Sequence, residues 1–276
     1  MNSSAAPSLL FDAISVNYGG ADVLRSVSLT IDPGELVVLL GPSGSGKTTL
    51  LRTVNRMVEP SAGRVLIDGQ DAASQDPVSV RRSIGYVMQA SGLFPHRTVL
   101  ENVAIVPRLL GASKSSARAT ALVTLERVGL DAGLASRYPA QLSGGQQQRV
   151  GVARAIAADP GILLMDEPFG ALDPITRRVL QQETRQLQAR TGATILFVTH
   201  DVDEALALGD RIIVLDAGGR IAQDATPTDI LTQPADAFVA ELVGVARGDR
   251  ALQLQTVGGK AVVSDRTGRP LGVLEA

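Results

Sequence analysis

The segment GPSGSGKT, residues 41–48, has the residue types and the spacing of a phosphate-binding loop. Its glycines let the backbone wrap around a phosphate chain with the N–H groups pointing inward. A helix that begins directly after the loop adds the partial positive charge of its N-terminus at the same place. The residues predicted to bind the phosphates of a nucleotide are Gly41, Ser43, Gly44, Ser45, Gly46, Lys47, Thr48 and Thr49.

Two side chains of this loop have predicted roles of their own. Lys47 is expected to reach the β- and γ-phosphates, and the Thr48 hydroxyl to bind Mg²⁺. Only three of the 26 basic residues are lysines, so a compact ammonium group is rare in this chain. The alternative is a glycine-rich turn with an incidental lysine, but the predicted strand before the loop and the helix after it favour the phosphate-binding loop.

Two adjacent carboxylates follow the apolar run at residues 162–165. Asp166 and Glu167 stand at the carboxyl end of this predicted strand, where ligands bind in open α/β sheets. Beside a phosphate-binding loop, Asp166 is predicted to hold the magnesium shell through water. Glu167 is then placed to polarise a water for attack on the γ-phosphate. The alternative is that both carboxylates only cap the strand in solvent.

The sequence LSGGQQQR, residues 142–149, predicts the start of another helix with an accessible N-terminus. Ser143 and Gln146 have the spacing of a capping box. Gly144 and Gly145 leave the first backbone N–H groups uncovered, so an anion can approach them. From the spacing alone, an ordinary helix cap with a tight glycine turn is the alternative.

The elements that must position these residues alternate between strands and helices. Helices are predicted at 47–57 and, with Asp173 as the cap, up to about residue 190. The pattern between about 92 and 159 is helical. Together these signals indicate an α/β fold with a mainly parallel sheet. Strands are predicted at 9–16, 27–31, 35–40, 64–67, 84–88, 162–165, 194–198 and 211–215.

Composition and charge exclude several classes of protein. The 276 residues are 45% hydrophobic and 20% charged, which is typical of a folded globular chain. A net charge of −2 gives no support for a nucleic-acid partner, and the absence of cysteine excludes disulfides and thiolate zinc sites. The longest apolar runs fall far short of the ~20 residues of a membrane-spanning helix. Residues 1–4 show no signal peptide, so we expect a cytoplasmic protein.

Taken together, these motifs resemble those of the ATP-binding cassette (ABC) ATPases. The phosphate-binding loop, LSGGQQQR with Ser143 96 residues after Lys47, ILLMDEP, and a histidine at a strand end occur in that family's order. The resemblance covers about residues 9–243. It implies a P-loop NTPase core of the RecA type with an antiparallel β subdomain and an inserted α-helical subdomain at about 92–159.

The resemblance implies further roles around the phosphate-binding loop. Tyr18 matches the aromatic residue that stacks on adenine, and Val23 lies where the family packs the ribose side. Gln89 matches the glutamine that touches Mg²⁺ or the attacking water and couples to a membrane partner. His200 matches the switch histidine that bonds the γ-phosphate. The alternatives are a strand-end aromatic for Tyr18, a polar loop residue for Gln89 and a helix-start residue for His200.

The resemblance also implies an assembly. Two copies close head to tail around two ATP molecules, so that Ser143, Gly144 and Gly145 contact the γ-phosphate held by the opposite copy. Asp173 lies in the loop that crosses this interface. The resemblance further implies that separate permease subunits supply the membrane pathway, that a substrate-binding protein acts indirectly, and that the chain works at the inner face of the cell membrane.

Part of the sequence is similar to one branch of the family, the importers of glycine betaine, choline, carnitine and related quaternary amines. The similar segments are MQASGLFPHRTVLENV at 88–103 and VPRLL at 106–110, followed by Ser113 and Lys114. An importer of a polyamine, amino acid or sulfonate remains an alternative. A soluble ABC ATPase of DNA repair or translation would need a coiled-coil insertion or tandem cassettes. A P-loop kinase would leave the helix at Ser143 and His200 without a function.

The last part of the chain differs in character from the rest. Strands are predicted at 257–264 and 271–274 around a polar turn at 265–269. This hairpin-like appendage resembles one strand pair of the CBS modules with which the quaternary-amine branch often ends. We therefore expect an ATPase domain at 1–243 and a short appendage at 244–276.

Overall fold

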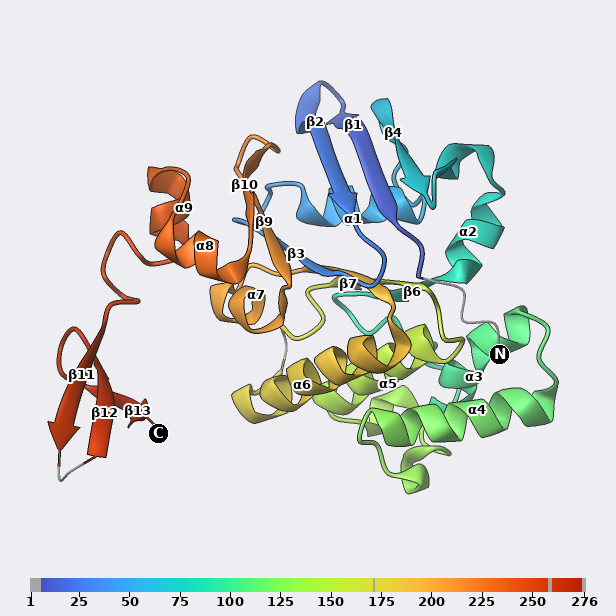
Figure 1. Cartoon of the computed structure of the whole chain (residues 1–276). Helices are drawn as coiled ribbons and strands as arrows, with labels where there is room; N and C mark the ends of the chain where they lie inside the picture. Colours follow the sequence, from blue (N-terminus) through green and yellow to red (C-terminus); the bar gives the residue numbers. More distant parts are fainter. Residues whose placement is uncertain (1–5, 171, 258–259, 275–276) are drawn as a thin grey trace.

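The computed structural model describes residues 6–170, 172–257 and 260–274. Residues 1–4, for which we predicted no signal peptide, lie outside these ranges. Residues 258–259 of the strand predicted at 257–264 also lie outside them. The described residues form three sheets and a set of helices (Figure 1). Among them, no helix has the length and the apolar character needed to cross a bilayer.

The central sheet has six strands, all parallel to their neighbours except β10. Every residue of the apolar strands β3, β7 and β8 is buried, as expected for parallel strands covered on both faces. The strand order is β10 (Ile221–Ala225), β9 (Arg211–Leu215), β3 (Leu36–Leu40), β8 (Thr194–Val198), β7 (Ile162–Asp166) and β6 (Ile84–Val87).

Two hydrophobic clusters cover the two faces of this sheet. Because side chains alternate along a strand, β3 sends Val38 and Leu40 to one cluster and Val37 and Leu39 to the other. The Val38 cluster includes residues of the helices drawn below the sheet in Figure 1. The Val37 cluster lies toward α1 (Lys47–Val54) and a second sheet.

That second sheet is antiparallel and lies over α1 (Figure 1). A 3-10 turn (Ala72–Ser74) and α2 (Pro77–Ser83) lead from it back to the central sheet. Its strand order is β2 (Ala21–Ile31), β1 (Leu9–Tyr18), β4 (Ala62–Ile67) and β5 (Gln70–Asp71).

The stretch predicted to be helical contains only helices and turns among its described residues. Thr98 forms a capping box with Glu101 at the start of α3 (Val99–Leu109), and Ser113 caps α4 (Lys114–Arg127). On α4, Ala117, Ala121 and Leu125 recur at helical spacing and are buried. Two 3-10 turns, Ala132–Leu134 and Pro139–Gln141, lead to α5 (Gly144–Ile156).

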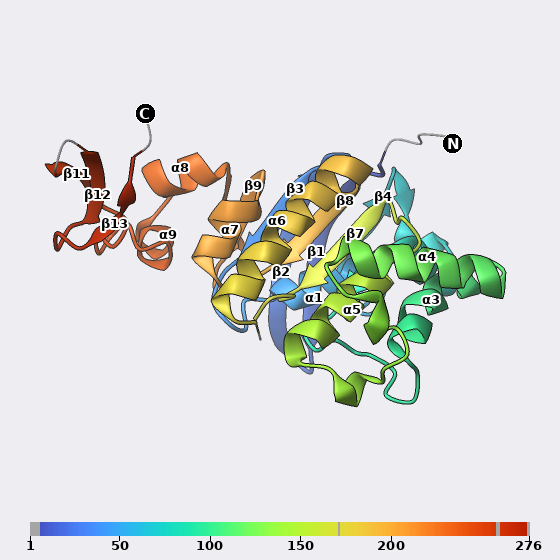
Figure 2. The same cartoon turned by 90° about the horizontal axis from the view of Figure 1, so that it is seen from below.

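After the central strand β7, the chain forms α6 (Pro174–Thr191), α7 (Val202–Leu208), α8 (Pro227–Thr232) and α9 (Ala237–Leu242). Asp173 caps α6 and Pro174 is its first residue, as predicted. The chain then forms a three-stranded antiparallel sheet of β11 (Leu252–Val257), β12 (Lys260–Asp265) and β13 (Pro270–Val273). Figures 1 and 2 show this sheet beside the rest of the molecule. The domain division at residue 243 and the CBS-like origin of the appendage stay predictions.

Several predicted boundaries were wrong. The helix after the phosphate-binding loop ends at Val54 and not at residue 57, because Asn55 caps it and Arg56 adopts a positive φ of 56°. The strand predicted at 27–31 begins at Ala21, where it pairs with Tyr18 of β1. The sequence analysis missed the strands β10 and β11. The strand β10 is short and polar and pairs only at the edge of the sheet, so it carries little hydrophobic pattern.

Candidate nucleotide-binding site

The predicted phosphate-binding loop connects the carboxyl end of β3 to the N-terminus of α1. Its glycines adopt positive φ values, 154° at Gly41, 83° at Gly44 and 90° at Gly46. A Cβ at Gly41 would lie 2.4 Å from the carbonyl oxygen of Leu215, and one at Gly46 would lie 2.9 Å from that of Val23. The turn therefore requires glycine, and it brings Val23 against the loop.

We expect Gly41→Ala to lower the free energy of unfolding by about 2 kcal/mol more than Gly44→Ala does. Both positions have a positive φ, but a Cβ at Gly44 meets no atom within 4 Å. The difference between the two variants therefore measures the close approach of the added Cβ to Leu215 and to Ser45 Oγ, 2.4 and 3.0 Å away. Urea denaturation of the nucleotide-free chains checks this prediction, and equal losses of stability would contradict it.

The Lys47 side chain is folded into the loop. Its ammonium group donates hydrogen bonds to the carbonyl oxygens of Gly41 and Pro42, both at 2.8 Å, and only 5% of the residue is exposed. Burial lowers the pKa of Lys47, while the nearby carboxylates of Glu167 and Asp166 oppose this shift. The positive charge is thus held at the centre of the loop, where a phosphate would meet it.

Asp166 joins the loop to the end of β7. The Thr48 hydroxyl donates to Asp166 Oδ1 at 2.6 Å, while Arg52 Nη2 and the Tyr86 hydroxyl donate to Oδ2 at 3.2 and 3.3 Å. Asp166 is 1% exposed, so these three donors compensate the burial of its charge. The sequence reading missed Arg52 and Tyr86. A helical spacing of four residues from Thr48 was a usable signal for Arg52.

Gln89, Glu167 and His200 meet at the carboxyl ends of three neighbouring strands, β6, β7 and β8. Glu167 Oε2 accepts a hydrogen bond from Gln89 Nε2 at 3.1 Å, and Glu167 Oε1 lies 3.1 Å from His200 Nδ1. Glu167 has a φ of 45°, which is uncommon for a residue other than glycine. Such strain concentrates at functional sites. The three side chains can hold a water and accept its proton.

Helix α5 anchors the segment that follows Gln89. The buried Arg154 donates to the carbonyl oxygens of Ser91 and Gly92 at 2.9 and 2.7 Å. Gln148 donates to the carbonyl oxygen of Met88 at 3.3 Å. Burial lowers the pKa of Arg154. The sequence reading missed both residues, because their partners are 60 or more positions away in the chain.

Ser143, Gly144, Gly145 and Asp173 form a separate group. The predicted capping box is present, with Gln146 N donating to Ser143 Oγ at 3.3 Å and Ser143 N donating to Gln146 Oε1 at 3.0 Å. These residues line a cavity of about 470 Å³ between α5 and the start of α6. Within the described ranges, no hydrogen bond or ion pair joins this group to the phosphate-binding loop.

Tyr18 lies at the tip of the β1–β2 hairpin, where it pairs with Ala21. Its residue surface is 54% exposed, which leaves the ring open for stacking. The predicted contact of this ring with adenine stays a prediction. The hairpin approaches the loop near Val23, since a Cβ added at Gly46 would lie 2.9 Å from the carbonyl oxygen of Val23.

Comparison with known proteins identifies similar chains. A family model described as ABC transporter matches residues 24–170, which is 147 of the 276 residues. The choline transport ATP-binding protein OpuBA of Bacillus subtilis is 51% identical over 87% of this chain, but this chain covers only 63% of that relative. The glycine betaine uptake system ATP-binding protein YehX of Escherichia coli is 44% identical over 90% of this chain and 80% of its own.

One solved structure has a similar fold and a bound product. It is described as the dimeric structure of a post-hydrolysis state of the ATP-binding cassette MJ0796 bound to ADP and Pi. It aligns with a TM-score of 0.75 at 36% identity, over 79% of this chain and 98% of its own. The similarity therefore extends over about four fifths of this chain, well beyond the short motifs.

Proposed function

Because the chain belongs to the ABC transporter family, we propose that it is the ATP-hydrolysing subunit of a bacterial importer of quaternary-amine osmoprotectants. The observation that carries the enzymatic part is the carboxylate of Glu167, held between Gln89 and His200 beside the phosphate-binding loop. The substrate class is supported by the names of the relatives, which transport choline or take up glycine betaine.

In this proposal the residues of one chain bind ATP and prepare the water. Lys47 and the N–H groups of residues 41–49 bind the phosphates at the N-terminus of α1. Glu167 accepts the proton of the attacking water, and Gln89 orients the Glu167 carboxylate and this water. His200 binds the γ-phosphate from the other side. The protein's contribution to phosphoryl transfer is then positioning and charge stabilisation.

The residues around Asp166 fit a magnesium ion. The Thr48 hydroxyl, the Asp166 carboxylate and the Gln89 amide offer the oxygen ligands that Mg²⁺ prefers. Among the described residues, no three His, Cys, Asp or Glu side chains form a metal cluster. Mg²⁺ commonly binds through only one or two carboxylates together with waters and substrate phosphates. When bound, the ion would neutralise charge on the phosphates.

A second copy of the chain completes the proposed site. The group around Ser143 lies apart from the phosphate-binding loop, so in one chain the exposed N-terminus of α5 faces no phosphate. In a head-to-tail pair, the Ser143–Gly145 segment of each copy faces the loop of the other. The dimeric cassette that aligns with this chain supports the arrangement.

We expect Gly144→Asp to prevent ATP-dependent dimerisation, because it adds a carboxylate at the N–H groups that would face the γ-phosphate. A Cβ at Gly144 meets no atom within 4 Å, so the monomer should fold normally. The change is made in a Glu167→Gln background, and the mass in the presence of ATP is measured by light scattering. Gly272→Asp is the matched control, since Gly272 is equally unobstructed but lies in β13. Dimers of the Gly144→Asp variant would contradict the prediction.

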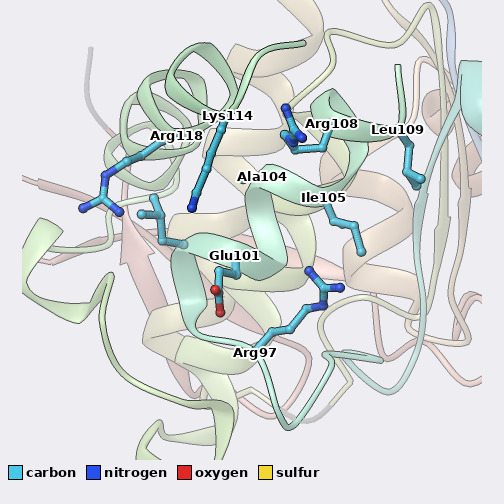
Figure 3. Close-up of a pocket in the computed structure, with 9 residues that line it drawn as sticks. Arg97, Glu101, Ala104, Ile105, Arg108, Leu109, Lys114 and Arg118 are labelled. Atoms are coloured by element: carbon cyan, nitrogen blue, oxygen red, sulfur yellow. The ribbon is translucent and has the colours of Figure 1, made fainter. Parts of the chain in front are cut away.

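In this proposal the permease subunits dock on the helices α3 and α4 of this chain. A cavity of about 580 Å³ lies on α3 and α4, and Figure 3 shows the side chains that line it. Four basic side chains and one acidic side chain surround its apolar floor, which supports a partner segment with apolar and acidic residues. The lining residues are Arg97, Leu100, Glu101, Ala104, Ile105, Arg108, Leu109, Lys114 and Arg118.

This cavity is linked to the proposed catalytic residues. The buried Asn102 of α3 donates to the carbonyl oxygens of Phe94, Arg97 and Thr98, at 3.2, 3.1 and 3.0 Å. The segment between Gln89 and α3 is thus held by α3 at one end and by Arg154 of α5 at the other. A partner that displaces α3 would therefore move Gln89.

We expect the charge reversal Lys114→Glu with Arg118→Glu to reduce ATP-driven uptake at least tenfold in cells, while the purified subunit keeps its ATPase rate. Both residues are exposed and lie on α4, away from the nucleotide residues. Arg190→Glu with Arg220→Glu is the matched control, with the same charge change at two other exposed positions. Equal uptake by the two double variants would exclude this surface as the permease site.

Uptake of labelled glycine betaine, choline and carnitine tests the proposed function. The cells lack other osmolyte importers and carry this protein with its own permease and substrate-binding protein genes. Uptake that is lost with Glu167→Gln supports a quaternary-amine importer working at the inner face of the membrane. ATPase activity without uptake of any of the three solutes would instead favour an importer of another solute.

A further inference from the structure

We propose that Arg177 is a positioning residue that couples the loop at Leu172–Asp173 to His200. This inference rests on the proposed function, since it concerns how the second copy of the chain would influence hydrolysis. Arg177 is the fourth residue of α6, and its guanidinium group reaches two other elements.

The guanidinium group of Arg177 joins the loop before α6 to the residues that follow His200, and we call this contact region the junction. Arg177 Nη1 donates to Asp201 Oδ2 at 3.1 Å, and Nη2 donates to the carbonyl oxygen of Leu172 at 3.4 Å. Its Nε lies 3.6 Å from Glu204 Oε1. The side chains of Arg177 and Asp201 are 29% and 32% exposed and that of Glu204 only 5%, so water screens the charge of Glu204 least.

On one side of the junction, the residues next to His200 are held in place. Asp201 Oδ1 accepts hydrogen bonds from Asp203 N and Glu204 N at the start of α7. Asp201 N donates to Thr199 Oγ1 at 2.9 Å, and the Thr199 hydroxyl donates to Glu204 Oε2 at 2.6 Å. His200 therefore stands between two anchored neighbours, with Nδ1 3.1 Å from Glu167 Oε1.

On the other side, Leu172 and Asp173 line the cavity in front of Ser143. Asp173 caps α6, and its carbonyl oxygen accepts from Arg177 N at 2.9 Å. A second copy that presses on this loop would shift Leu172 and Arg177 together. The shift would reach Asp201, and through it His200.

Within the described part of the chain, the junction contains a hydrogen-bond donor without an acceptor. Arg177 Nε is buried and makes no hydrogen bond, although Glu204 Oε1 is close. An approach of about half an ångström would bring this pair into hydrogen-bond range. Burial raises the pKa of Glu204, whereas the Thr199 hydrogen bond and the charge of Arg177 favour its ionised form. Without Arg177, Glu204 would lose its nearest positive charge.

The test compares the kinetics of four variants of the full chain. Arg177→Ala should lower kcat for ATP hydrolysis at least tenfold and leave KM within twofold, because the phosphate-binding loop is untouched. Asp201→Asn should give the same loss, because it removes the charge that pairs with Arg177. Its Oδ1 can still cap α7, so the variant should keep the start of that helix. The double variant should lose no more than either single one. Arg185→Ala is the control, because it removes another ion pair of α6, with Asp210, and should keep kcat.

Wild-type kcat in Arg177→Ala, or additive losses in the double variant, would overturn the coupling. A loss no larger than that of Arg185→Ala would also overturn it. If Arg177→Ala does not fold, Asp201→Asn decides the question alone, by a tenfold loss or none. Failure of the proposed ATPase activity is distinguishable, because the wild-type chain would then hydrolyse no ATP, and failure of the proposed substrate class would change uptake without changing these rates.

Discussion

Replacement of Glu167 by Gln will lower the ATPase rate at least 100-fold and leave ATP bound between two copies of the chain. A glutamine keeps the size and the hydrogen-bonding reach of the side chain, but it cannot accept the proton of the attacking water. A positioned general base typically contributes 10²–10⁴-fold to a rate, so its loss should dominate the result. Steady-state hydrolysis and the mass of the ATP-bound species are the measurements.

The environment of Glu167 makes this test specific. The side chain is only 18% exposed and has a partner for each carboxylate oxygen, Gln89 Nε2 and His200 Nδ1. Glu126→Gln is the matched control, because Glu126 is exposed near the end of α4 and should keep the wild-type rate. Normal hydrolysis by the Glu167 variant would exclude this residue as the base.

Replacement of Lys47 by Arg will weaken ATP binding at least tenfold although the positive charge is kept. The ammonium group fits between the carbonyl oxygens of Gly41 and Pro42, 2.8 Å from each. A guanidinium group is planar and larger, and it presents its donors in a rigid fork that this buried pocket does not match. Because the residue is 5% exposed, the longer side chain has little room to move outward.

The dissociation constant for ATP, measured by calorimetry, checks this prediction. Lys114→Arg is the control, because Lys114 is exposed on α4 and the substitution is the same chemical change made away from the loop. The control should keep wild-type affinity. Unchanged affinity in the Lys47 variant would count against this residue as the phosphate ligand.

Sequence reasoning succeeded where the relevant contacts are local. The capping box of Ser143 and Gln146 and the Asp173 cap join residues at most three positions apart, so spacing alone predicts them. The phosphate-binding loop and the buried strands β3 and β7 are also short continuous patterns. Their order along the chain was enough to predict the α/β fold and the family, which the family match confirms.

Tertiary folding added the contacts that join distant segments. Asp166 is held by Arg52 and Tyr86, 114 and 80 residues away. Arg177 reaches Asp201 across 24 residues. No local pattern encodes such pairs, because they depend on which strands become neighbours in the sheet. For the Ser143 group, spacing alone predicted only a helix cap, and the expectation that it faces the loop of a second copy came from the resemblance to the family, since that placement depends on the packing of α5 and α6 against the core.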